Sequence, residues 1–288
     1  MTGRRAGGAV QAQRSTSLGF PPRSAAGDPR SFPRKGLHRP SSPPTLGKSE
    51  NPTTVMDDYR DSRAPGTLIL VSTPIGNLGD MTARAVETLK KVSAILAEDT
   101  RHTRKLLAHF DIHNQLVSYH DHNKERVTPG FIRRLLDGED LAVVSDAGTP
   151  GISDPGFYIL RAAIAEGIPV SVVPGANAIL PALILSGFPT DAFVFEGFLP
   201  RKQGELDRKL RSLEDERRTF VAFVSPHKLL KVLEAIDRVL PARQIAVARE
   251  ITKVHEEVRR GMARELLTHF GGGEVRGEFV LVVKGREK

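Results

Sequence analysis

The chain has 288 residues, of which 39% are hydrophobic, enough to form one large or two average domains. It contains no cysteine, which excludes disulfides, thiolate zinc sites and cysteine nucleophiles. The formal net charge of +8 lies in residues 1–48, where nine basic side chains stand against a single acid, Asp28. Because the whole chain has 42 basic and 34 acidic residues, the other 240 residues hold 33 of each, and their overall charge does not indicate nucleic-acid binding.

Residues 1–65 are predicted to be a disordered basic extension. The segment is rich in Ser, Pro, Gly and Arg and has no apolar periodicity, so it cannot bury enough surface to offset the cost of ordering. An Arg-rich start is also typical of a transit peptide, although no amphipathic stripe is visible, and Met56 offers an alternative initiator. No apolar run reaches 18 residues, so we expect a cytoplasmic protein that does not enter the membrane.

Apolar runs alternate with helical patterns across residues 66–188, which predicts an α/β domain with a parallel, doubly wound sheet. The expected strands are 67–71, 93–97, 115–119, 141–144 and 169–173. The expected helices are 81–91 with Asp80 as N-cap, 101–110, one from Thr128-Pro129 to about 138, one capped by Asp154 before Pro155, and one ending at Ser186.

The pattern changes at Phe188, and residues 189–288 are predicted to form a second α/β domain. The expected strands are 192–198, 219–224, 244–249, 254–260 and 278–283, and the expected helices are 205–215, one beginning at Ser225-Pro226, and 263–270. This half has more strands per residue and hairpin-like connections, which favour a mixed sheet.

The stretch from Leu141 to Gly156 is a buried strand, a glycine-rich turn and the start of a helix. Open α/β sheets bind ligands at such turns, at the carboxyl ends of their strands. Gly148 and Gly151 would let the backbone approach a ligand without an intervening side chain. An ordinary turn with two glycines is the alternative interpretation.

Two polar clusters follow other predicted strands. The residues from Glu98 to His102 come directly after the strand 93–97, at a position where α/β proteins carry chemistry. His120 and His122, with Asp121 between them, would bind a metal only if all three side chains converged, and a hydrogen-bonding loop is preferred. No Walker lysine motif, dinucleotide-binding glycine pattern or serine nucleophile elbow is present, and we expect no metal.

Seven motifs in order carry a resemblance to a known family. They are Ser72-Thr-Pro-Ile-Gly-Asn-Leu78, Ala97-Glu-Asp-Thr-Arg-His-Thr103, Ser145-Asp-Ala-Gly-Thr-Pro150, Asp154-Pro-Gly156, Glu196-Gly-Phe-Leu-Pro200, Ser225-Pro-His227 and Ala248-Arg-Glu-Ile-Thr-Lys253. This set resembles the tetrapyrrole methylase family, and within it the enzymes that methylate ribosomal RNA. Three positions depart from the family pattern: Ser72 often is Pro, Phe223-Val224 often is Tyr-Glu, and Lys228 often is Arg.

The resemblance implies two α/β domains with S-adenosylmethionine bound between them as methyl donor. It also implies 2′-O-methylation of a cytidine in the decoding region of 16S rRNA within the small ribosomal subunit, and a homodimer. The residues implied to contact the donor are Asp146, Ala147, Gly148, Ile152, Ser153, Gly175 and Ala178. Asp146 has a second possible role, because an Asp after a strand commonly hydrogen-bonds its own turn.

A ribose hydroxyl is a very weak acid, so a base or a positioned cation is expected beside it. The candidate catalytic residues are Asp99, Arg101, His102, Glu250 and Lys253. Imidazole has the most suitable ordinary pKa, whereas a lysine would need its pKa lowered. For Glu98 and Asp99 the alternative is salt bridging to Arg101 and Arg104.

Arg201 and Lys202 are predicted to contact RNA phosphates, because no acidic residue is adjacent to them in the sequence. Two other functions compete with rRNA methylation. The chain could methylate a tetrapyrrole or another small molecule, or it could be a ribosome-binding homologue that has lost activity, as the departures at Phe223-Val224 and Lys228 would suggest.

Overall fold

The computed structural model of the protein describes residues 64–287. The extension predicted over residues 1–65 lies outside the described residues, apart from its last two positions. None of the helices in the described part is both long enough and apolar enough to cross a membrane.

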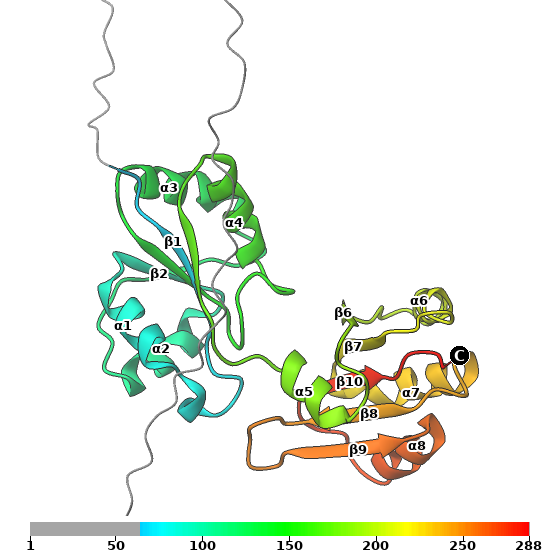
Figure 1. The fold of residues 1–288 in the computed structure, drawn as a ribbon. Coiled ribbons are helices and arrows are strands. Elements are labelled where there is room, and N and C mark those ends of the chain that lie inside the picture. The colour runs from blue at the N-terminus through cyan, green and yellow to red at the C-terminus, as the bar shows by residue number, and fades with distance from the viewer. Residues whose placement is uncertain (1–63, 288) are drawn as a thin grey trace, which may run out of the picture. The chain divides into compact units, whose positions relative to one another are not determined.

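The first sheet, which contains the labelled strands β1 and β2 in Figure 1, has five parallel strands in the order β3-β2-β4-β1-β5. The strands are β1 (Leu68–Val71), β2 (Ala94–Ala97), β3 (Leu116–Ser118), β4 (Leu141–Val144) and β5 (Val170–Val173), and the helices are α1 (Ala83–Lys91), α2 (Thr100–His109), α3 (Lys124–Leu136) and α4 (Gly156–Ala165). Helices α1 and α2 pack on one face of this sheet, and α3 and α4 pack on the other. Both faces of β4 are therefore buried, as its uninterrupted apolar run predicts.

The second sheet is mixed, in the order β6-β7-β10-β8-β9, and only the β6–β7 pair is parallel. Its strands are β6 (Phe193–Phe198), β7 (Thr219–Val224), β8 (Ile245–Arg249), β9 (Glu257–Gly261) and β10 (Phe279–Val283), and its helices are α6 (Gln203–Ser212), α7 (Leu229–Val239) and α8 (Ala263–Gly271). Strand β9 begins three residues later than expected, after a turn that leaves Val254 95% exposed. The α/β class with a mixed second sheet is confirmed.

Helix α5 (Ile179–Ser186) packs on the second sheet. Its buried residues Ile179, Ala182 and Leu183 join a core cluster with side chains of β7, β8 and β10. The helices α6, α7 and α8 cover the opposite face. The domain boundary at 188 and 189 stays a prediction, but the chain already contributes to the second core from residue 179.

Several helix starts differ from the sequence prediction. Helix α6 begins two residues early, and α7 begins at Leu229, after a short 3-10 turn at Pro226–Lys228. Thr82, not Asp80, caps α1, because its Oγ1 accepts a hydrogen bond of 3.1 Å from the Ala85 amide. Helix α3 begins at Lys124 and contains Pro129. A proline at this position removes the helical hydrogen bond to the Glu125 carbonyl. The neighbouring Thr128 hydroxyl donates to the Lys124 carbonyl at 2.6 Å, one residue away from the carbonyl that Pro129 leaves free.

The carboxyl ends of β1, β2 and β4 bring three polar loops to one edge of the parallel sheet. A two-way backbone bridge joins the first of these loops to the third: the Thr73 amide donates to the Gly148 carbonyl at 2.9 Å, and the Gly148 amide donates to the Thr73 carbonyl at 3.1 Å. This bridge fixes the glycine-rich turn after β4.

Candidate functional site

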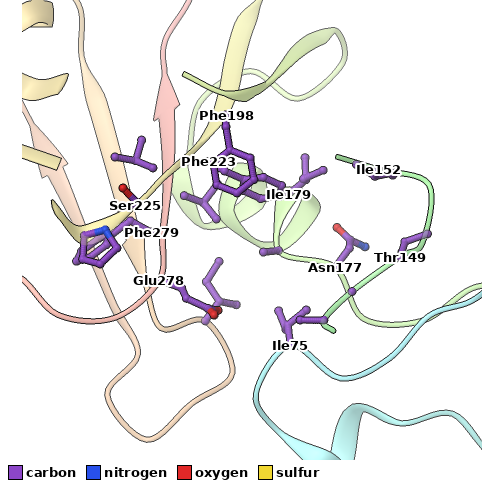
Figure 2. Close-up of a pocket in the computed structure, with 17 residues that line it drawn as sticks. Ile75, Thr149, Ile152, Asn177, Ile179, Phe198, Phe223, Ser225, Glu278 and Phe279 are labelled. Atoms are coloured by element: carbon purple, nitrogen blue, oxygen red, sulfur yellow. The ribbon is translucent and has the colours of Figure 1, made fainter. Parts of the chain in front are cut away.

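A cavity of about 340 Å³ opens beside the glycine-rich turn (Figure 2). Its lining comes from both sheets and is mostly apolar, with few polar side chains: Ile75, Ala147, Gly148, Thr149, Ile152, Asn177, Ala178, Ile179, Phe198, Phe223, Val224, Ser225, Pro226, Ile251, Glu278, Phe279 and Val280. This volume and this mixture of apolar walls with a few polar groups are typical of small-molecule sites. We call it the apolar cavity.

The turn at Gly148 approaches the cavity with bare backbone. Gly148 has φ +81°, a conformation that side-chain-bearing residues rarely adopt. A Cβ at this position would lie 3.6 Å from Cγ2 of Ile75, across the cavity wall. Glycine here therefore leaves no side chain between the turn and a ligand, as the sequence predicts. The amide and carbonyl of Gly148 itself are taken up by the bridge to Thr73, so the hydrogen-bonding groups open to a ligand are those of its neighbours, such as the Ala147 amide.

Asp154 holds the far end of the same turn. Its Oδ1 accepts hydrogen bonds of 2.8 Å from the Gly151 amide and 2.8 Å from the Gly156 amide, directly before α4. Pro155 stands just outside the helix, not at its first residue. Burial raises the pKa of the Asp154 carboxyl, and the hydrogen bonds from these amides act in the opposite direction.

The structure brings most of the residues predicted to contact the donor to the apolar cavity. Ala147, Gly148, Ile152 and Ala178 line it. The others lie elsewhere: Asp146 lines a neighbouring cavity, Ser153 is exposed with φ +64°, and Gly175 packs so closely on Ser72 that a Cβ would lie 3.0 Å from its Cβ.

Most of the cavity-lining residues from the second half of the chain were not predicted from the sequence. Phe198 and Phe223 pack ring against ring at 5.3 Å between centroids (Figure 2). Glu278 and Phe279 add to the lining where β10 begins, although the Phe279 ring is buried against Phe270 on the other face of the sheet. Phe198 and Ser225 lie within two of the seven motifs, so the resemblance to the family could have indicated them. At Val224, where the family often has an acid, the side chain is 4% exposed in the core of the second sheet, so its role here is packing.

A second cavity, of about 190 Å³, adjoins the first across the bridge between Thr73 and Gly148. It is lined by Thr73, Pro74, Gly76, Leu78, His102, Lys105, Leu106 and Asp146. Asp146 Oδ1 accepts a hydrogen bond of 3.0 Å from the Asp99 amide, which ties the loops after β2 and β4 together. We call this the polar cavity.

Asp99 is the N-cap of α2 and an ion-pair partner. Its carboxylate accepts from the Arg101 amide at 2.8 Å and from the Arg101 guanidinium at 2.9 and 3.2 Å. These side-chain and backbone hydrogen bonds from Arg101 hold the pKa of the Asp99 carboxyl well below its usual range. Such a carboxylate is a weak proton acceptor, and the arrangement matches the salt-bridge alternative for Asp99 and Arg101.

Glu98 differs from its neighbour. Burial first, and then the nearby charges of Asp146, Asp154 and Asp121, raise the pKa of its carboxyl. No ion pair with Arg101 or Arg104 forms among the described residues, so salt bridging does not explain Glu98. The raised pKa makes it a stronger base than an ordinary glutamate.

Lys253 lies between two carboxylates in a strained turn. Its Nζ is 2.9 Å from Glu250 Oε1 and 3.1 Å from Glu278 Oε2, and both Glu250 and Thr252 have positive φ. Burial lowers the pKa of Lys253, but the hydrogen bonds that its ammonium donates to the two glutamates outweigh burial, and the pKa is raised. The lowered pKa that a lysine base requires is therefore absent, and Lys253 acts as a cation.

Replacing Lys253 by Met should lower the free energy of unfolding by about 1–2 kcal/mol near pH 7, because Glu250 loses its counter-ion in a partly buried site. Burial raises the pKa of Glu250, but Lys253 and the Glu278 amide together lower it in the folded state. Its contribution is thus present above the ordinary glutamate pKa and is lost as the pH falls through the folded pKa. The raised pKa of Lys253 implies a second loss at strongly alkaline pH. Urea unfolding of both proteins from pH 3 to 8 checks this, and a constant difference down to pH 3 would contradict it.

The predicted phosphate contacts lie on or beside α6. No acid is adjacent to Lys202 in the sequence, but its Nζ is 3.5 Å from Glu205 Oε1, three residues further on. Arg201 is exposed. The rings of His120 and His122 are 5.9 Å apart, and the described residues contain no group of three or more acidic, histidine or cysteine side chains placed to hold a metal.

The protein has the architecture of an α/β methyltransferase of the tetrapyrrole methylase type: a doubly wound parallel sheet, a mixed second sheet and an apolar cavity bounded by a bare glycine turn. The sequence model of the family Tetrapyrrole (Corrin/Porphyrin) Methylases matches residues 67–267. The chain belongs to this family. The resemblance drawn from the seven motifs is confirmed.

Curated relatives of the chain carry the name ribosomal RNA small subunit methyltransferase I. The protein from Synechocystis is 50% identical over 221 residues, which cover 76% of this chain and 79% of the relative. The one from Halalkalibacterium halodurans is 47% identical over 227 residues (79% and 78%), and the one from Thermotoga maritima is 44% identical over 222 residues (77% and 100%).

Solved structures share the fold at low identity. A cobalt precorrin-4 methyltransferase superposes with a TM-score of 0.58 at 16% identity, covering 76% of this chain and 94% of that one. Uroporphyrin-III C-methyltransferase from Thermus thermophilus, complexed with S-adenosyl homocysteine, gives 0.53 at 19% identity (76% and 97%). At these identities the likeness supports the fold alone.

Proposed function

We propose that the protein transfers the methyl group of S-adenosylmethionine to the 2′-oxygen of a cytidine in the decoding region of 16S rRNA. The observation that carries this proposal is the apolar cavity, bounded by the bare backbone at Gly148. Its relatives' names supply the substrate class, and the complex of Thermus thermophilus uroporphyrin-III C-methyltransferase with S-adenosyl homocysteine supports the donor.

The residues that line the apolar cavity fit such a donor. Phe198, Phe223 and the isoleucines offer apolar surface to a nucleobase and an aliphatic chain. Asn177, Glu278 and the backbone at Ala147 offer hydrogen bonds to polar groups. When bound, the donor supplies an activated methyl group on its sulfonium. The chain's own task is to hold the acceptor oxygen in line and to accept its proton.

Among the candidate catalytic residues, we assign the proton acceptor to His102. Its ring lines the polar cavity, next to the turn that borders the donor. Asp99 is held by Arg101, and Glu250 and Lys253 hold each other. Neither cavity is lined by Arg101, Glu250 or Lys253, so we assign no proton transfer to them.

Methyl transfer from labelled donor to 30S subunits that lack the modification tests the proposal, with mass spectrometry to map the modified nucleoside. The expected product is a 2′-O-methylcytidine in the decoding region. Donor binding with transfer to a tetrapyrrole would favour the small-molecule methylase, and donor binding without transfer to either substrate would favour the inactive ribosome-binding homologue. A substrate in the small ribosomal subunit would place the protein in the cytoplasm.

A homodimer is part of the proposal. The edge strand β5 exposes Val170 and Val172, and α4 and α5 expose Ile164, Phe157 and Ile184, with Ile184 at 68% exposure. Large exposed apolar side chains of this kind are typical of a protein interface. Sedimentation equilibrium should give twice the chain mass of 31.5 kDa. A mass equal to that of one chain would contradict the homodimer.

A further inference from the structure

The outer face of α2 is unusually basic. The exposed positions of this helix are Arg101, His102, Arg104, Lys105, Ala108 and His109. The helix contains no acidic residue, and Arg101 and Lys105 stand at i and i+4, where like charges destabilise a helix. Asp99, the N-cap, compensates Arg101, but no acid on the helix compensates Arg104 or Lys105.

The basic side chains of α2 differ in whether they form ion pairs. Arg101 is engaged by Asp99. Arg104 and Lys105 form no ion pair with any residue that the structure describes. Four basic side chains on or near α6, α7 and the start of β7 do form one: Lys202 with Glu205, Lys209 with Glu196, Arg218 with Glu216 and Arg238 with Asp207. The charges of α2 are thus available to a ligand, and most of those near α6 are partly neutralised.

The basic face of α2 continues into the polar cavity. Lys105 and His102, one turn apart on the helix, both line it, together with Thr73 and Asp146 from the ends of β1 and β4. A volume of about 190 Å³ can accept a nucleobase or a ribose, but is small for a larger group. The cavity offers imidazole, hydroxyl and carboxylate groups for hydrogen bonds, beside cations suited to phosphate.

We propose that the polar cavity and the α2 face, Arg104 and Lys105, form the RNA-anchoring site: one nucleotide enters the cavity, and Arg104 and Lys105 bind its flanking phosphates. This inference rests on the proposed function and moves the principal RNA contact from Arg201 and Lys202 to the first sheet. Charge complementarity selects the occupant, because a polyanion with unstacked bases satisfies both the cations and the cavity.

The test is filter binding of 30S subunits at several salt concentrations by the wild type and by the Arg104→Ala/Lys105→Ala variant. Loss of two phosphate contacts should weaken binding about 10-fold or more at low salt and reduce the slope of log K against log salt by about 1.4 for single-stranded RNA. A matched control is Arg126→Ala/Arg133→Ala, which removes the same charge from exposed positions of α3, on the opposite face of the same sheet. Thermal unfolding and S-adenosylhomocysteine affinity report whether each variant is folded.

The outcomes separate the two proposals. Suppose that the wild type binds and methylates 30S subunits, but the α2 variant keeps its affinity and salt slope or matches the α3 control. This result overturns the anchoring site and leaves the proposed function standing. A wild type that neither binds nor methylates 30S subunits overturns both. A selective loss for the α2 variant, with Arg201→Ala/Lys202→Ala near wild type, supports the assignment.

Discussion

Replacing His102 by Ala should reduce the turnover of methyl transfer by about 10²- to 10⁴-fold, the usual contribution of a positioned proton acceptor. The ring lines the polar cavity, and its removal leaves the hydroxyl without the acceptor we assign to it. S-adenosylhomocysteine affinity should stay unchanged, since His102 does not line the apolar cavity. Single-turnover kinetics on 30S subunits, with calorimetry for the ligand, measure both quantities.

His109→Ala is the matched control, because it removes an exposed imidazole from the last turn of the same helix. It should turn over like the wild type. Glu98→Gln addresses the rival acceptor, whose pKa burial and neighbouring acids raise. Wild-type turnover in His102→Ala together with a large loss in Glu98→Gln would reassign the proton acceptor to Glu98.

Replacing Gly148 by Val should weaken S-adenosylhomocysteine binding about 100-fold, equivalent to about 2.8 kcal/mol. A β-branched residue at φ +81° is strained, and a Cβ there lies between Ile75 Cγ2 at 3.6 Å and the Ala176 carbonyl oxygen at 3.8 Å. The added methyl groups would enter the apolar cavity or displace the turn. Isothermal titration calorimetry gives the affinity.

Gly167→Val is the control that separates the effect of backbone strain from that of obstructing the ligand site. Gly167 has φ +67°, close to that of Gly148, but a Cβ there has no atom within 4 Å and the residue lies beyond the end of α4. Both variants should lose about 1–3 kcal/mol of unfolding free energy, but only Gly148→Val should lose the ligand. Equal affinity in the two variants would show that the glycine turn does not border the donor.

The contacts of the strained turn at residues 250–253 could not be predicted from the sequence. Thr252 donates to Asp80 at 2.5 Å across 172 residues of sequence, and a Cβ on Gly76 would lie 2.3 Å from Cε of Lys253. Asp80 looks like a helix cap in the sequence because it precedes a helical pattern. Its carboxylate instead meets a loop of the second half, and no local spacing encodes that contact.

The sequence by itself determined the strands, the glycine turn and the family. Continuous apolar runs place β4 and β7 at the residues predicted, and the ordered motifs identify the tetrapyrrole methylases. These features are local, because burial and turn chemistry act on consecutive residues. Only the tertiary structure decided that α5 packs on the second sheet, that Phe223 and Phe279 wall the apolar cavity, and that Lys253 is held as a cation by Glu250 and Glu278. Those outcomes depend on which distant surfaces pack together, and packing follows from the whole chain.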